Sequence, residues 1–172
     1  ARLQQLGSAH RPALVRFHLW HEAHVLSSLE RFFPLPEWAR AERQRFIKTL
    51  EELVGPWPAA SPATGDLARV YRRDQDVKGP MGAFGYDYFQ DKYGAERAAR
   101  IRLLRYQGQR GSGGEYAYEA LNLASRGFNV QRVAEDLGAI YGPIPVEPVA
   151  EYLEALRVIG VLEPASAPSP SR

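Results

Sequence analysis

The sequence predicts a mainly α-helical protein with minor β structure: an N-terminal helical hairpin followed by a small winged-helix-like module of three helices. Three observations support this fold class. Apolar residues recur at helical spacing in two N-terminal segments, three short helical segments separated by tight turns fill residues 115–160, and only short apolar runs remain for strands. With 172 residues, 45% of them hydrophobic, the chain is long enough to bury a core.

Residues 1–60 form the predicted hairpin. The first helix is expected over 13–33, where apolar side chains surround much of the helical surface, and Pro34 and Pro36 break the chain after it. The second helix, 36–55, has proline in its opening turn and Gly55 at its end. Its inward side chains are predicted to be Trp38, Phe46, Ile47, Leu50 and Leu53.

Residues 61–114 are predicted to be a loop-rich connector with a short strand and a basic helix. The proline-rich stretch 55–65 marks a boundary, and 67–71, LARVY, is a plausible strand. The glycines and the proline in 72–85 forbid a regular element there. Helical spacing returns over 87–107, with a break expected at Gly94.

The module proper spans residues 115–163. Its helices are expected over 115–124, 130–142 and 146–160, separated by SRGFN and PIP, and residues 161–163 form a closing strand. The small polar and proline residues of 164–172 predict a disordered tail. Such a three-helix pattern with a closing strand is typical of winged-helix and helix-turn-helix modules.

The charge of this module argues against DNA binding. Residues 115–172 carry four arginines and eight carboxylates, a net charge of −4, whereas the whole chain nearly balances 22 basic against 20 acidic residues. The third helix presents Glu147, Glu151 and Glu154 where a reader of the major groove would carry arginine or lysine. The prediction is therefore a protein-facing role, without a nucleic-acid partner. No apolar run is long enough to cross a bilayer, so no membrane partner is predicted either.

Basic residues gather instead in the connector, at Arg97, Arg100, Arg102, Arg105 and Arg110. This run could meet RNA, an acidic partner or a membrane surface. The alternative is a helix face that pairs with the acidic module of the same protein, and the opposite regional charges favour this alternative.

Three of the four histidines lie close together in FHLWHEAHVLSSLERFF, which raises the question of a metal site formed by His18, His21, Glu22 and His24. The zincin motif needs two residues between its glutamate and second histidine, whereas H-E-A-H has only one. His18 with His21 or Glu22 could share a helix face, but the carboxylates that could complete such a site have no matching spacing: Asp74, Asp76, Asp87 and Asp91. We expect His21 and His24 to pack or hydrogen-bond and the helix to bind no zinc.

Two further motifs point to no chemistry. KGPMGAFG lacks the Gly-Lys-Ser/Thr ending of a phosphate-binding loop, and Ser112 lacks the G-x-S-x-G context of a nucleophile. No catalytic, cofactor-binding or metal-binding residue is therefore predicted in this chain.

The C-terminal segment resembles the C-terminal module of large bacterial di-zinc aminopeptidases of the leucyl aminopeptidase and aminopeptidase Y type. The matching pieces, over about 45 residues, are Leu121, Asn122 and Leu123; Val130 and Val133; Tyr141 to Pro145; and Tyr152, Leu153, Ala155, Leu156, Gly160 and Val161. The segment is also similar to small winged-helix peptide-recognition modules of ribosomal-peptide biosynthesis. The family's zinc ligands have no counterpart here, so no catalytic residue is carried over.

The resemblance implies an accessory region of a zinc aminopeptidase. Its zinc would belong to the parent protein, which would hydrolyse N-terminal residues from peptides and is exported in many members. The expected partners are the parent's own catalytic domain, a peptide or a second copy. A start at Ala1, with Met81 as the only methionine, favours a processed product or a piece of a longer protein, while the absence of cysteine leaves the compartment open.

Two other function classes remain from the sequence. The first is a free-standing winged-helix module that binds a peptide as an added strand beside its short sheet. The second is a transcriptional regulator, which the negative charge of the third helix disfavours.

Overall fold

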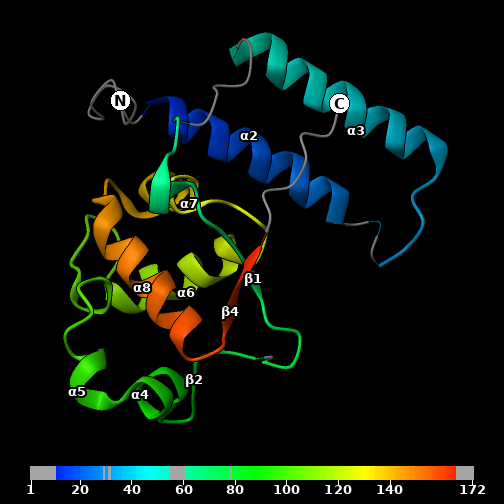
Figure 1. Ribbon diagram of the computed structural model, residues 1–172. Helices are drawn as coiled ribbons and strands as arrows, with labels where there is room; N and C mark the ends of the chain where they lie inside the picture. The colour runs from blue at the N-terminus through cyan, green and yellow to red at the C-terminus, as the bar shows by residue number, and fades with distance from the viewer. Residues whose placement is uncertain (1–10, 29, 31, 55–60, 78, 166–172) are drawn as a thin grey trace. The chain divides into compact units, whose positions relative to one another are not determined.

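A computed structural model describes residues 11–28, 30, 32–54, 61–77 and 79–165, and is mainly α-helical with two small antiparallel sheets (Figure 1). The chain divides into two compact units, an N-terminal unit, Ala1–Ala60, and a C-terminal unit, Ser61–Arg172. The division lies within the proline-rich stretch 55–65.

The N-terminal unit is built from α2 (Arg11–Ser28) and α3 (Glu37–Val54), which pack against each other. Glu30, in the connection between the helices, forms ion pairs with Arg40 at 3.3 Å and with Arg43 at 3.1 Å. The start of α3 is fastened by the backbone N–H groups of Ala39 and Arg40, which both donate to the carbonyl of Pro36.

The end of the first helix differs from the prediction. α2 ends at Ser28 rather than at residue 33, and Phe32 and Phe33 are 80% and 52% exposed. The residue that precedes a proline is disfavoured in helical backbone, and Pro34 and Pro36 follow at once. The apolar spacing of these two phenylalanines predicted helix, but the prolines that follow disfavour helical backbone at this point.

The prediction that Trp38 and Phe46 point inward is wrong, because they are 73% and 46% exposed. The more covered positions of α3 include Ala39, Ile47 and Leu50, which are spaced as one helical face. Trp38 and Phe46 each precede a member of this face by one residue and so lie about 100° around the helix axis. The side chain of Leu53 lies outside the described residues.

The C-terminal unit is centred on the three predicted helices, α6 (Gly113–Ala124), α7 (Val130–Tyr141) and α8 (Val146–Val158). Their facing side chains form the core, in which the following are completely buried: Leu123, Val133, Leu137, Leu153 and Leu156. Local signals start two of these helices. Ser112 and Glu115 form a capping box on α6, and the Asn129 side chain accepts the backbone N–H of Arg132 at 2.9 Å at the start of α7.

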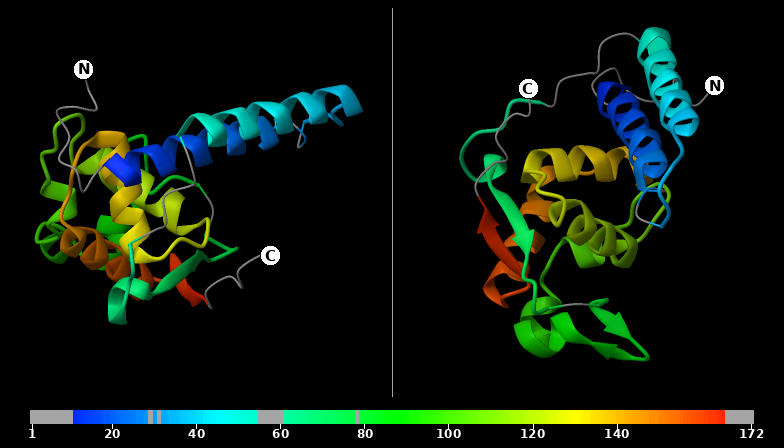
Figure 2. Two further views of the ribbon diagram at one scale, coloured as in Figure 1. Left: turned by 90° about the horizontal axis from the view of Figure 1, so that it is seen from above. Right: turned by 90° about the vertical axis from the view of Figure 1, so that its right-hand side faces the viewer.

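A two-stranded antiparallel sheet closes the C-terminal unit (Figure 2). β1 (Val70–Arg73) pairs with β4 (Leu162–Ala165) in the register Val70 opposite Ala165 and Arg73 opposite Leu162. Val70 also forms an isolated bridge with Asn129, between α6 and α7. The partner of the closing strand thus comes from the connector, so the predicted connector and module form one unit.

The connector contains more regular structure than predicted. The predicted strand 67–71 is displaced, because η2 (Gly65–Ala68) is a 3₁₀ turn and β1 begins only at Val70. A short hairpin, β2 (Gly82–Ala83) and β3 (Tyr86–Asp87), lies in and just beyond the stretch predicted to have no regular element.

The predicted helix over 87–107 is present only in pieces. α4 (Tyr88–Tyr93) and α5 (Ala95–Ala98) meet at Gly94, the predicted break, where φ is +92°. The chain then continues through a turn into η3 (Leu103–Arg105), so the basic segment 97–110 is not one helix.

Two sequence predictions concern the chain's end and the bilayer. β4 extends to Ala165, two residues beyond the predicted strand, and residues 166–172 of the predicted tail lie outside the described residues. Among the described helices, none combines the length and the apolar character needed to cross a membrane.

Candidate binding pocket

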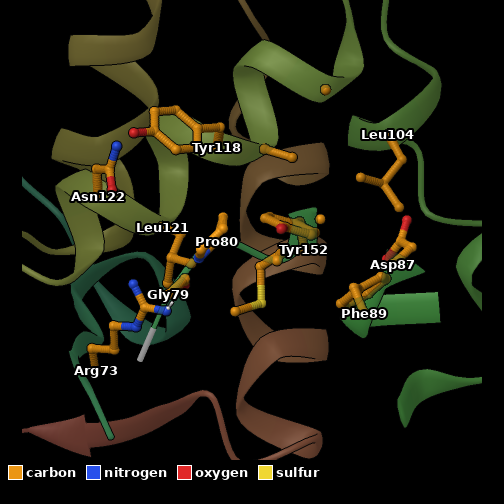
Figure 3. Close-up of a pocket in the computed structure, with 14 residues that line it drawn as sticks. Arg73, Gly79, Pro80, Asp87, Phe89, Leu104, Tyr118, Leu121, Asn122 and Tyr152 are labelled. Atoms are coloured by element: carbon orange, nitrogen blue, oxygen red, sulfur yellow. Dashed lines mark hydrogen bonds between the residues drawn. The ribbon is translucent and has the colours of Figure 1, made fainter. Parts of the chain in front are cut away.

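A pocket of about 630 Å³ lies within the C-terminal unit, between α6, α8 and the segment that runs from β1 to α4 (Figure 3). Most of its lining is apolar and is contributed by Pro80, Met81, Phe89, Leu104, Ala117 and Leu121. The polar side chains of the lining are Arg73, Asp87, Tyr118, Asn122 and Tyr152. We call this site the Tyr152 pocket.

Small residues on α6 leave room for this pocket. Gly114 and Ala117 lie three residues apart on the helix face that lines it, with Tyr118 and Leu121 continuing that face. A Cβ atom added at Gly114 would meet no atom within 4 Å. The side of α6 that bears Gly114 therefore faces open space.

Arg73 supplies the positive charge of the lining. Its Nε donates to the carbonyl of Val77 at 2.9 Å, and Nη2 donates to the carbonyl of Gly79. Figure 3 shows the side chain beside Gly79 at one end of the pocket. A guanidinium has five N–H donors, so three remain after these two bonds, and no carboxylate among the described residues pairs with Arg73.

Tyr152 supplies a hydroxyl at the end of a mostly buried side chain. The residue is only 2% exposed and its ring packs on Phe89 at a centroid distance of 5.3 Å, yet its hydroxyl makes no hydrogen bond to the residues that the structure describes. Burial raises the pKa of this hydroxyl well above its ordinary value, and the charge of Asp87 raises the pKa further. Like any tyrosine hydroxyl it is protonated at neutral pH, so it can donate a hydrogen bond to a ligand in the pocket.

The remaining polar groups of the lining either already form hydrogen bonds within the protein or are more exposed to solvent. Both oxygens of Asp87 accept from Gln90, one from its backbone and one from its side chain, at 2.9 and 3.1 Å, which caps α4. Asn122 donates to Glu119 at 3.2 Å, and Tyr118 is largely exposed. Arg73 and Tyr152 are consequently the two groups with the clearest spare donors.

The acidic face of α8 is largely occupied from within the unit. Glu154 accepts from Arg157 at 2.6 Å, from Arg69 at 3.2 Å and from the Tyr71 hydroxyl at 3.2 Å. The hydrogen bond from Arg157 is the main reason why the pKa of Glu154 is lowered. Burial, above all, raises the pKa of Tyr71.

Part of the basic segment 97–110 forms contacts with other residues of the same unit. This agrees with the alternative expected from the sequence, in which the basic residues pair within the protein. Arg102 bonds to Glu151 at 2.7 Å, and Arg110 donates to the carbonyl of Ala139 at 3.2 Å. Arg97 lies over the Tyr93 ring at 4.7 Å. Arg100 and Arg105 are exposed and have no such partner among the described residues.

The histidines of α2 contact aromatic rings, His21 and His24 one turn away along the helix and His18 on the adjacent residue. His21 stacks on Phe17 at 5.7 Å and His24 stacks on Trp20 at 5.2 Å, while His18 meets Phe17 edge-on at 5.5 Å. The i, i+4 contacts of His21 and His24 agree with the predicted packing role of these two residues. Within the described part of the chain, no group of three metal-ligating side chains converges, and Glu22 is exposed. That α2 binds no zinc stays a prediction, which metal analysis of chelator-free protein would test.

Most of the other side chains considered from the sequence have local structural roles. Asp74 accepts the backbone N–H of Asp76 at 2.8 Å, and Asp91 accepts from the Tyr86 hydroxyl at 2.9 Å. Ser112 belongs to the capping box of α6. Of these side chains only Asp87 lines the pocket, and the sequence pattern did not single out Arg73 or Tyr152 as site residues. The small residues of α6 were the one signal that could have indicated a gap there.

No family model matches this chain, and neither the curated proteins nor the solved structures contain a match to it.

Proposed function

We propose that this chain is a non-catalytic binding region whose C-terminal unit holds an apolar peptide segment in the Tyr152 pocket. The observation that supports this proposal best is a largely apolar pocket of about 630 Å³ with a few polar groups, since ligand pockets measure roughly 300–1,000 Å³ and share this composition. Residues 61–172 contain neither histidine nor cysteine, so a Ser–His or Cys–His pair cannot form within this unit.

The geometry favours the pocket over strand addition. An added peptide strand needs a run of free backbone donors and acceptors at a sheet edge. β4 has only four residues, and one of them, Pro164, lacks a backbone N–H. Short edge strands that contain proline are a common protection against strand pairing.

The wider setting of the proposal is an accessory region of a zinc aminopeptidase. The resemblance supports this setting, and three of its matching residues, Leu121, Asn122 and Tyr152, line the pocket. A zinc-ligand pattern immediately upstream of Ala1 in the same reading frame would support this part of the proposal. A native reading frame that starts near residue 1 would contradict it.

Peptide binding can be tested by NMR titration of the ¹⁵N-labelled chain with two blocked tetrapeptides, acetyl-Ala-Leu-Phe-Leu-amide and acetyl-Ala-Ser-Asn-Ser-amide. Only the apolar peptide should shift the amides of Met81, Phe89 and Tyr152. The Met81→Asp variant should weaken this binding at least tenfold, because it places a charge in the apolar lining. Val158→Asp, an equivalent change at an exposed position outside the lining, should not.

Thermal unfolding of both variants would show that they remain folded. The absence of pocket shifts with either peptide at millimolar concentration would overturn the proposal. Equal shifts with the polar peptide would overturn it as well.

A further inference from the structure

The two groups with the clearest spare donors, Arg73 and Tyr152, give the Tyr152 pocket a chemical preference. Both offer N–H or O–H hydrogens, and the one carboxylate in the lining, Asp87, is bonded to Gln90. A ligand that satisfies them must therefore bring acceptors. An anionic acceptor suits Arg73 best, because its guanidinium has no carboxylate partner among the described residues.

The position of Arg73 is held by the protein itself. Two loop carbonyls, of Val77 and Gly79, accept from its guanidinium. A fixed guanidinium with spare N–H groups loses little conformational freedom when it binds a carboxylate. The apolar side chains of Met81, Phe89 and Leu121 adjoin this charge in the same pocket.

We propose that the ligand of the Tyr152 pocket is a peptide C-terminus that ends in an apolar residue. Its carboxylate binds the Arg73 guanidinium, its apolar side chain packs on Met81, Phe89 and Leu121, and a backbone carbonyl accepts a hydrogen bond from the Tyr152 hydroxyl. This assignment rests on the proposed function, because it specifies which part of a peptide the pocket holds.

The experiment compares acetyl-Ala-Leu-Phe-Leu as the free acid and as the amide, with affinities measured by NMR titration and calorimetry. The acid should bind about tenfold tighter or more, because hydrogen bonds to charged groups are stronger than those between neutral groups. Arg73→Gln should abolish this preference. Arg100→Gln, which removes an exposed arginine outside the lining, should retain it.

A second variant guards against misfolding of Arg73→Gln, since Arg73 also fastens the loop. Tyr152→Phe keeps the ring that packs on Phe89 and removes a hydroxyl without a partner among the described residues. Its melting temperature should not fall, while the affinity for the free acid should drop roughly threefold to tenfold.

Several outcomes separate the possible failures. If neither peptide shifts the pocket amides, the proposed function itself fails. If acid and amide bind equally well and both variants leave this unchanged, the peptide binds but the C-terminal assignment is overturned. If N-acetylleucine binds as tightly as the tetrapeptide acid, the pocket selects small apolar acids, and the peptide assignment is overturned.

Discussion

A methyl group at Gly113, in the first turn of α6, would collide with the backbone of η3. A Cβ atom built there would lie 2.2 Å from the carbonyl oxygen of Leu104 and 2.6 Å from that of Leu103. Gly114 is the next residue of the same helical turn, and its added Cβ would meet nothing within 4 Å. Neither glycine has positive φ, so the contrast between them is one of space alone.

Gly113→Ala should therefore destabilise the chain by about 1–3 kcal/mol, the usual cost of overpacking. Gly114→Ala should be neutral or stabilise by up to about 1 kcal/mol, because alanine is the better helix former. Urea unfolding of both variants would measure the difference. Equal stabilities would show that α6 does not approach η3 as closely as described.

Glu154 links α8 to β1 by accepting from Tyr71 in the strand and from Arg69 just before it, and it also accepts from Arg157 on its own helix. Its pKa is lowered in the folded state, so its contribution to stability is complete above the ordinary glutamate pKa and is lost as the pH falls through the lower folded value. The side chain is more than a third exposed, which screens these interactions.

Glu154→Gln should lower the free energy of unfolding by about 1 kcal/mol at pH 7. The difference in unfolding free energy between this variant and the original protein should approach zero below the folded pKa of Glu154. At such a pH the carboxyl is protonated in both the folded and the unfolded state. Chemical denaturation at a series of pH values from neutral to acid would measure it. A constant difference across this range would contradict the assigned role of the charge.

At the scale of elements, the β2–β3 hairpin carries an unusual turn. Its two loop residues, Phe84 and Gly85, both have positive φ, at +52° and +84°, as a type I′ turn requires. Asparagine followed by glycine is the preferred pair in such turns, whereas a bulky residue in left-handed backbone costs about 1–2 kcal/mol. Phe84 is fully exposed and gains no packing in return.

Phe84→Asn should raise the stability by about 1 kcal/mol, because asparagine tolerates this backbone conformation. The effect would appear as a higher melting temperature in calorimetry. Phe84→Ala is the matched control, since it removes the same ring but keeps the strained backbone. A gain of equal size in the alanine variant would show that removal of the ring, not relief of the turn, is responsible.

At the scale of the whole molecule, pairing between β1 and β4 makes residues 61–165 one folding unit. Val70 and Tyr71 of β1 are buried in the core, together with Phe89, Ile101 and Leu103 of the connector. Burying one large apolar side chain contributes about 1.5–3 kcal/mol. The helices of residues 115–163 thus depend on the connector for a substantial part of their core.

A fragment of residues 61–172 should therefore fold by itself and unfold cooperatively, since it corresponds to one compact unit. A fragment of residues 115–172, the module expected from the sequence with its tail, should remain largely unfolded because it lacks these core residues and β1. Circular dichroism and the dispersion of NMR amide signals would distinguish the two. Cooperative unfolding of the shorter fragment would contradict the role given to the connector.

The sequence by itself determined the helices of the C-terminal unit. α6, α7 and α8 lie where apolar spacing predicted them, because Ser112 with Glu115, Asn129 and Gly142 are start and stop signals that act over a few residues. The break at Gly94 was predictable for the same reason. The mainly α-helical fold class followed from such local signals.

Only the tertiary structure decided which elements meet. β1 and β4 are separated by some ninety residues, and no local signal specifies this pairing or its register. Apolar spacing also predicted, wrongly, that Trp38 and Phe46 point inward. Spacing alone does not show how much of a helix surface is covered by the rest of the fold. The Tyr152 pocket exists only because the small residues of α6 lie opposite Met81 on the connector and Tyr152 on α8, an arrangement that depends on long-range packing.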